Sequence, residues 1–187
     1  MEFATPESHS APIYIYDRLD EPSRGMLEEN LLAAEGAEVA VTFATGMAAV
    51  SGALGVLTAT GNRIVAHQTL YGCTHSPLTS WLPRYKICTN FCDLTKPESL
   101  AKVATKNCRV VYLETPVNPT MELIDLRAFR QVVERRNEGQ REPEKIRIVV
   151  DNTFATPDGQ CPLPHGIDIV VHSLTKDIGG FGTEMAG

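Results

Sequence analysis

A lysine with two neighbouring hydroxyl groups follows an apolar segment near the end of the chain. Lys176 comes shortly after the apolar residues 167–171 and is preceded by Ser173 and Thr175. A desolvated lysine is the usual nucleophile for Schiff-base chemistry, and adjacent hydroxyls can hydrogen-bond a phosphate group. The alternative is a solvated loop lysine without a chemical role, because lysine is rarely buried.

An aspartate ends another apolar segment. Residues 146–150 read Ile-Arg-Ile-Val-Val and are followed by Asp151. A carboxylate at such a place can pair with the protonated nitrogen of a pyridine ring, which is the partner that pyridoxal phosphate (PLP) requires. The alternative is a turn-capping aspartate, because Asp-Asn-Thr is good turn chemistry.

A threonine and a glycine open a run of small residues. Thr45, Gly46 and Met47 precede Ala48-Ala49-Val50-Ser51-Gly52, which predicts a helix over about 47–59. The first turn of a helix has N–H groups without intrahelical acceptors and the positive end of the dipole, so it can hold a phosphate. Thr45 is also a good N-cap, and the two roles are compatible because a capping turn can bind an anion.

The elements that must position these residues alternate between short β-branched runs and helical segments. This alternation predicts βαβ units, and therefore an α/β fold with a mostly parallel sheet flanked by helices. In such a sheet ligands bind beyond the carboxyl ends of the strands, which is where the candidate residues lie. Helices are predicted from Pro22 to the residue before Gly36 and over residues 47–59, 72–82 (ended by Pro83), 97–105 and 126–135, and strands over 64–66, 85–88, 110–113, 146–150 and 167–172.

Composition limits the classes of function. The 187 residues carry 17 Lys+Arg and 23 Asp+Glu, and a net charge of −6 argues against binding nucleic acid by phosphate neutralisation. The apolar runs are too short to span a membrane, and the first ten residues resemble no signal peptide. The odd number of five cysteines favours reduced thiols, so we expect a cytoplasmic protein. No second cysteine pair has zinc spacing, and we expect no metal site.

Six segments, in order and in spacing, resemble the Cys/Met-metabolism (trans-sulfuration) family of PLP-dependent enzymes. The segments are Tyr16-Asp17-Arg18 with Pro22, residues 44–49, Leu70-Tyr71-Gly72, residues 114–119, residues 150–157 and residues 172–176. The family includes methionine γ-lyase, cystathionine γ-synthase, cystathionine lyases and O-acetylhomoserine sulfhydrylase. The resemblance implies a PLP-dependent fold of the aspartate-aminotransferase type (fold type I). Because known members are about twice as long, the chain resembles their N-terminal half.

The resemblance also implies roles for individual residues. Lys176 matches the lysine that binds PLP covalently, Asp151 the carboxylate facing the pyridine nitrogen, and Tyr71 the tyrosine that stacks on the ring and assists proton transfer. Asn118 matches a residue near the phenolic oxygen. The matches to phosphate-binding residues are Gly46, Met47, Ser173 and Thr175, together with Tyr16 and Arg18, which a neighbouring subunit of a homo-oligomer (dimer or tetramer) would donate.

The implied reaction is cleavage of a carbon–sulfur bond in a sulfur amino acid. We expect an α,γ-elimination like that of methionine γ-lyase. The alternatives are a γ-replacement, as in O-acetylhomoserine sulfhydrylase or cystathionine γ-synthase, and a PLP-binding fragment that is inactive by itself. We expect residues 1–20 to form an arm and residues 21–187 a truncated PLP-binding domain without its C-terminal small domain. The 187 residues alone are expected to be inactive.

The chain departs from the family pattern at several positions. Glu21 stands where the family usually has asparagine, and Asp177 follows the lysine where an aromatic residue is common. Cys73 resembles methionine γ-lyases at a position where many relatives carry glycine. It either tunes the choice of substrate from beside the ring or is a small buried residue that acts as a hydrophobe.

Overall fold

The computed structural model describes residue 16 and residues 21–187. The chain divides into two units between Thr42 and Phe43. The boundary between an arm of residues 1–20 and a domain of residues 21–187 therefore remains a prediction. In the described part, no helix combines the length and the apolar character needed to cross a membrane.

The first unit contains helix α1 (Pro22–Glu35), as the sequence predicts. The Glu21 carboxylate caps it by accepting the N–H groups of Ser23 at 3.1 Å and Arg24 at 2.5 Å. Pro22 occupies the first turn, where its missing N–H costs nothing. Gly36 ends the helix in the left-handed conformation that glycine adopts readily. Glu21, the departure from the family's asparagine, thus supplies a helix cap.

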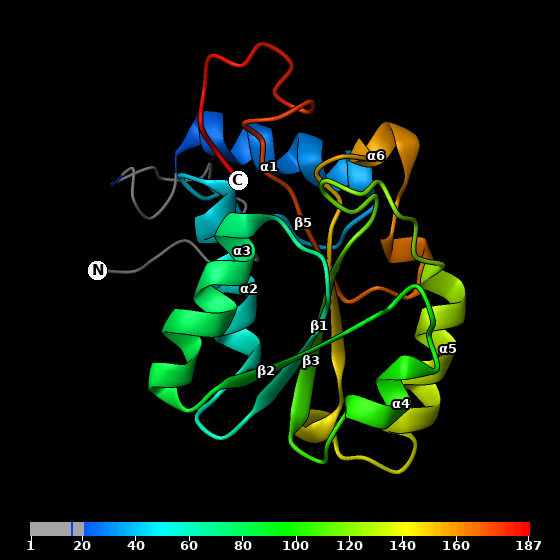
Figure 1. Cartoon of the computed structure of the whole chain (residues 1–187). Helices are drawn as coiled ribbons and strands as arrows, with labels where there is room; N and C mark the ends of the chain where they lie inside the picture. The colour runs from blue at the N-terminus through cyan, green and yellow to red at the C-terminus, as the bar shows by residue number, and fades with distance from the viewer. Residues whose placement is uncertain (1–15, 17–20) are drawn as a thin grey trace, which may run out of the picture. The chain divides into compact units, whose positions relative to one another are not determined.

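The second unit is built on a five-stranded sheet in the order β2-β1-β3-β4-β5, and all its strand pairs are parallel (Figure 1). The strands are β1 (Arg63–His67), β2 (Cys88–Cys92), β3 (Cys108–Glu114), β4 (Arg147–Asp151) and β5 (Ile169–Val171). The helices are α2 (Gly46–Leu57), α3 (Gly72–Ser76), α4 (Ser99–Val103), α5 (Leu126–Asn137) and α6 (Thr156–Gly159). The predicted parallel α/β architecture is confirmed.

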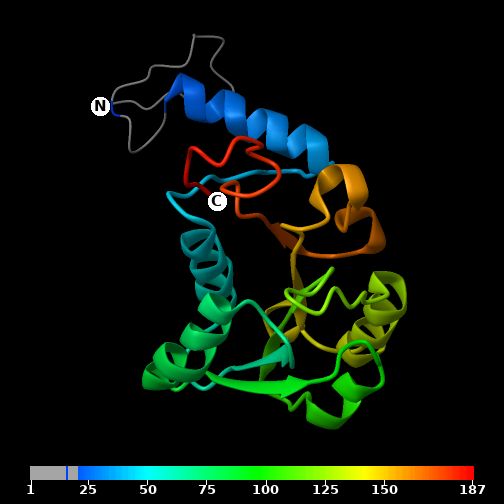
Figure 2. The same cartoon turned by 45° about the horizontal axis from the view of Figure 1, so that its top comes forward.

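Two apolar clusters cover the two faces of this sheet, because successive side chains of a strand point to opposite faces. On one face, Leu113 and Ile148 pack with Phe129 of α5 and Leu100 of α4. On the other, Val110, Tyr112 and Val149 pack with Val50 and Leu54 of α2. The two views in Figures 1 and 2 show α2 and α3 on one side of the sheet and α4 and α5 on the other.

The sequence prediction is wrong around residues 77–92. The helical backbone continues past Pro83, because a π turn (Pro77–Trp81) is followed by a 3-10 turn (Leu82–Tyr85) that accommodates proline in its first positions. The strand predicted at 85–88 instead begins at Cys88. Lys86 is left-handed, with φ of 58°, and so breaks the extended backbone. Pairing with β1 then makes Cys88–Cys92 a strand although its sequence, CTNFC, has weak strand character.

Candidate cofactor site

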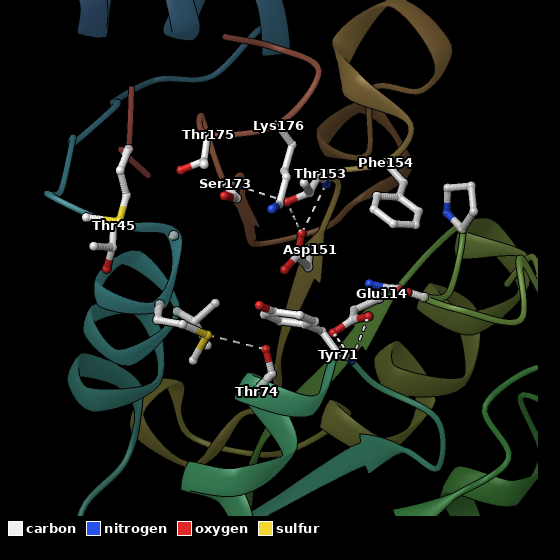
Figure 3. A pocket seen from close by; sticks show the side chains of 16 residues that line it. Thr45, Tyr71, Thr74, Glu114, Asp151, Thr153, Phe154, Ser173, Thr175 and Lys176 are labelled. Carbon is white, nitrogen blue, oxygen red and sulfur yellow. Dashed lines mark hydrogen bonds between the residues drawn. The ribbon is translucent and has the colours of Figure 1, made fainter. Parts of the chain in front are cut away.

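A pocket of about 230 Å³ lies at the carboxyl ends of the strands (Figure 3). Glu114 ends β3, Asp151 ends β4, and Lys176 follows β5. Eight residues singled out in the sequence line this one pocket: Gly46, Met47, Tyr71, Asn118, Asp151, Ser173, Thr175 and Lys176. The structure therefore brings together segments from all parts of the second unit, as expected for a ligand site in a parallel sheet.

The N-terminus of α2 approaches the segment after β5 so closely that only glycine fits at residue 46. A Cβ atom added to Gly46 would lie 2.8 Å from Ser173 Cβ and 3.0 Å from Ser173 Cα. Thr45 caps the helix, since its hydroxyl accepts the Ala48 N–H at 3.0 Å. The first-turn N–H groups, which no intrahelical carbonyl can accept, thus lie beside the Ser173 hydroxyl. This arrangement of a helix N-terminus and a hydroxyl suits a phosphate group.

The Asp151 carboxylate joins the turn after β4 to the pocket. Its Oδ1 accepts the N–H of Thr153 at 3.0 Å and the Thr153 hydroxyl at 2.5 Å, which is the turn-capping role that the sequence allowed. Its Oδ2 accepts the hydroxyl of the buried Tyr112 at 3.2 Å. The Thr153 hydroxyl also accepts the Ser173 N–H at 2.9 Å, so one threonine connects the carboxylate with the segment after β5.

Lys176 extends into the pocket from a turn, and Figure 3 shows its amine facing the side of the pocket that carries Asp151. The turn is closed by its own backbone, since the Lys176 N–H donates to the Ser173 carbonyl at 3.1 Å. The residue is exposed, which differs from the desolvated lysine expected for a Schiff-base nucleophile. The hydroxyl of Thr175 exchanges hydrogen bonds of 3.2 and 3.3 Å with the backbone of Ala186.

Tyr71 reaches the pocket from the loop between β1 and α3, and its ring extends toward the centre of the view in Figure 3. It is 41% exposed, which leaves a ring face available to a flat ligand. Hydrogen bonding with the Cys73 side chain raises the pKa of the Tyr71 hydroxyl. Cys73 itself is exposed and is not part of the pocket lining. The substrate-tuning role of Cys73 therefore remains a prediction.

Two predicted contacts lie outside this pocket's description. Tyr16 is 51% exposed in the first unit, and Arg18 lies outside the described residues. Their donation to a phosphate site of a neighbouring subunit remains a prediction. Among the described residues there is no group of three or more His, Cys, Asp or Glu side chains that could hold a metal ion.

Sequence reasoning missed several lining residues, of which Glu114 matters most. It is 4% exposed, and burial raises the pKa of its carboxyl to about 7. Its position at a strand end was visible in the sequence, but nothing there distinguished it from a residue of the following turn. The other lining residues without a predicted contact are Thr45, Val50, Thr74, Pro116, Thr153, Phe154 and Met185.

The comparisons with known proteins agree with this geometry. The pattern that defines the Cys/Met metabolism PLP-dependent enzymes matches residues 2–187. The chain belongs to this family. An L-methionine gamma-lyase of Fusobacterium nucleatum is 40% identical to this PLP-dependent family member over 174 residues, which are 93% of this chain and 42% of the relative. An O-acetyl-L-homoserine sulfhydrylase of Leptospira meyeri is 37% identical over 92% of this chain and 37% of the relative.

The fold comparison agrees with the family. The crystal structure of metB from Corynebacterium glutamicum superposes with a TM-score of 0.87 at 29% identity. It covers 100% of this chain and 46% of that chain. The predicted fold type I class is therefore confirmed for this member of the Cys/Met metabolism family, which spans less than half the length of the relatives it matches.

Proposed function

We propose that this chain is the PLP-binding part of an enzyme that cleaves a carbon–sulfur bond in a sulfur amino acid. The observation that carries the proposal is the single pocket in which a lysine, a carboxylate, an aromatic ring and a helix N-terminus converge at the strand ends. Membership of a PLP-dependent family and likeness to methionine gamma-lyases support it. A methionine γ-lyase-like α,γ-elimination is our first choice.

The residues of the pocket fit the chemical groups of PLP. Gly46 opens the space beside Ser173 that a phosphate would occupy, and the α2 dipole favours its negative charge. Asp151 has one oxygen directed to Tyr112 and can hold a proton on a ring nitrogen. Tyr71 offers an aromatic face, and Asn118 an amide for the phenolic oxygen. Arg18 and Tyr16 of a second subunit are proposed to complete the phosphate site.

Lys176 carries the chemistry that depends on a proton. Its Nζ is the amine in the pocket able to bind an aldehyde covalently, and when free the same atom can accept the proton of a substrate α-carbon. PLP, when bound, supplies an electron sink that stabilises negative charge on that carbon. Tyr71 is placed to orient the ring and to help move a proton, and Asp151 keeps the sink effective by holding the nitrogen protonated.

Two alternatives differ in what happens after the proton is removed or in whether turnover occurs at all. The likeness to an O-acetyl-L-homoserine sulfhydrylase favours a γ-replacement. The pocket lining favours a fragment that binds PLP but is inactive alone, because no arginine is among the described lining residues to hold a substrate carboxylate. Assays for α-ketobutyrate and for sulfide-dependent replacement, with this chain and with the full reading frame, separate these cases.

We also propose that the enzyme is a cytoplasmic homo-oligomer, a dimer or tetramer, with residues 1–20 as an arm and residues 21–187 as the PLP-binding domain. The five cysteines are free thiols, which a reducing compartment maintains. A subunit-mixing experiment tests the shared site. R18A and K176A subunits, mixed in the full-length enzyme, should regain activity because one intact site forms per dimer. Activity no higher than either parent would contradict the arm's role.

The test of the cofactor assignment is direct. Wild-type protein incubated with PLP should acquire a yellow absorption that borohydride reduces to a stable adduct, and K176A should lose the adduct while keeping its circular dichroism spectrum. K102A, which removes an exposed lysine of α4, serves as the matched control and should keep the adduct. An adduct of unchanged yield in K176A would contradict the assignment.

A further inference from the structure

The carboxylate of Glu114 fastens the loop that carries Tyr71. Glu114 ends β3, the central strand, and its side chain is buried at the pocket. Both of its oxygens lie 3.0 Å from the backbone nitrogen of Tyr71 (Figure 3). Tyr71 immediately precedes α3, and no side chain caps that short helix. The contact to Glu114 is therefore the hydrogen bond that fixes the start of α3 relative to the sheet.

The same carboxylate also accepts the backbone N–H of Asn118. Asn118 lies in the loop after β3, whereas Tyr71 lies in the loop after β1. One buried acceptor thus joins two loops that otherwise leave the sheet on separate strands. A carboxylate is suited to this because it only accepts hydrogen bonds, and bonds to a charged acceptor are about twice as strong as neutral ones.

We propose that Glu114 is a positioning residue that holds the Tyr71 ring and the Asn118 amide in place on the two sides of the pocket's ligand ring. The assignment of that ring to PLP rests on the proposed function. The fastening itself rests on the hydrogen bonds alone. No part of it requires Glu114 to touch the ligand.

The charge of Glu114 decides how well it can do this. Burial and the nearby Asp151 carboxylate, its register partner on β4, oppose ionisation, while the N–H groups of Tyr71 and Asn118 favour it. Tyr112 on β3 also faces this pair, and Lys176 lines the same pocket. When Glu114 is protonated, one oxygen becomes a donor, so two N–H groups compete for the remaining acceptor. We expect the two loops to be held more tightly above pH 7 than below it.

Amide hydrogen exchange of the chain without PLP tests the fastening. In E114Q the side-chain NH2 meets two N–H donors, and exchange at Tyr71 and Asn118 should rise about tenfold or more, while Val149 in the middle of β4 stays protected. E134Q, which changes an exposed glutamate of α5, is the matched control and should alter neither amide. Wild-type protection at Tyr71, corrected for intrinsic exchange, should rise from pH 6 to pH 8, and E114Q should show no such rise.

Unchanged exchange at both amides in E114Q would overturn the proposal, and so would an equal rise at Val149, which would indicate general destabilisation. If E114Q does not fold, E114D keeps the charge on a shorter side chain and should lose protection at Tyr71 or Asn118. Retention of both in E114D would equally overturn it.

Addition of PLP separates this inference from the proposed function. If wild-type protein forms no borohydride-reducible adduct, the proposed function is wrong, whatever the exchange result. If wild type forms the adduct and E114Q matches its affinity and absorption maximum, the function stands and Glu114 does not position the ring contacts. We expect E114Q to form the adduct with at least fivefold weaker affinity and a shifted maximum.

Discussion

Glu114 should make the stability of this protein depend on pH in a direction opposite to that of most acidic side chains. Burial raises its pKa from the ordinary 4.5 to about 7. Between these values the folded state keeps a proton that the unfolded state has released, so the free energy of unfolding falls as pH rises. The full difference corresponds to about 3 kcal/mol, of which about 1 kcal/mol is lost between pH 6 and pH 8.

Urea unfolding of wild type and E114Q from pH 6 to pH 8 measures this contribution. The lower limit stays above the isoelectric point of about 5.4, where proteins lose solubility. Glutamine does not titrate, and its altered hydrogen bonds affect all pH values equally. The difference between the two curves therefore isolates the carboxyl group. It also removes His67, whose pKa is lowered by burial and whose contribution rises with pH.

The expected result is a wild-type stability that falls by about 1 kcal/mol relative to E114Q over this range. E134Q, with its exposed site on α5, should run parallel to wild type. If the curves of wild type and E114Q are parallel between pH 6 and pH 8, Glu114 is ionised throughout and the reasoning from burial is wrong.

Three further substitutions test the packing around the site. G46A places a Cβ 2.8 Å from Ser173 and should weaken PLP binding at least tenfold in a fluorescence titration, whereas G55A in the same helix meets nothing within 4 Å and should stabilise by about 0.5–1 kcal/mol. Unchanged PLP affinity in G46A would show that the cup tolerates the methyl group. Y112F removes the hydrogen bond to Asp151 and should lower the free energy of unfolding by about 1 kcal/mol in urea; no change would mean that the bond adds nothing. F129A leaves a cavity under α5, away from the pocket, and should cost about 3–5 kcal/mol while PLP still binds; loss of binding in folded protein would contradict this separation.

The fold could be predicted from the sequence where an element depends on its own residues. Helix α1 has a capping carboxylate before it and Gly36 after it, and β4 is a run of β-branched residues, so both were found near their observed limits. Strand β2 could not be found, because its strand state comes from pairing with β1 rather than from its sequence. The turn at Lys86, which separates it from the preceding helical segment, depends on a left-handed residue that is not glycine.

The candidate site divides along the same line. Lys176, Asp151 and Gly46 follow or precede strong local patterns, and the pocket contains all three. Glu114 was not distinguished, because its importance arises from the distant N–H of Tyr71 and from its register with Asp151. The exposure of Lys176 was also not foreseen, since solvent contact depends on what packs over a turn rather than on the residues in it.

The contact between Gly46 and Ser173 has a consequence for the order of events during biosynthesis. Gly46 is made early, but the residues that face it are made only after nearly the whole chain has been translated. Because β5 must pair with β4 before Ser173 reaches the helix, the phosphate-binding cup is the last feature of the second unit to form. A ligand bound there stabilises only chains that have completed the sheet, by mass action. Cellular supply of that ligand would then act as a check on newly made chains, protecting the finished ones from proteolysis and leaving the incomplete ones exposed to it.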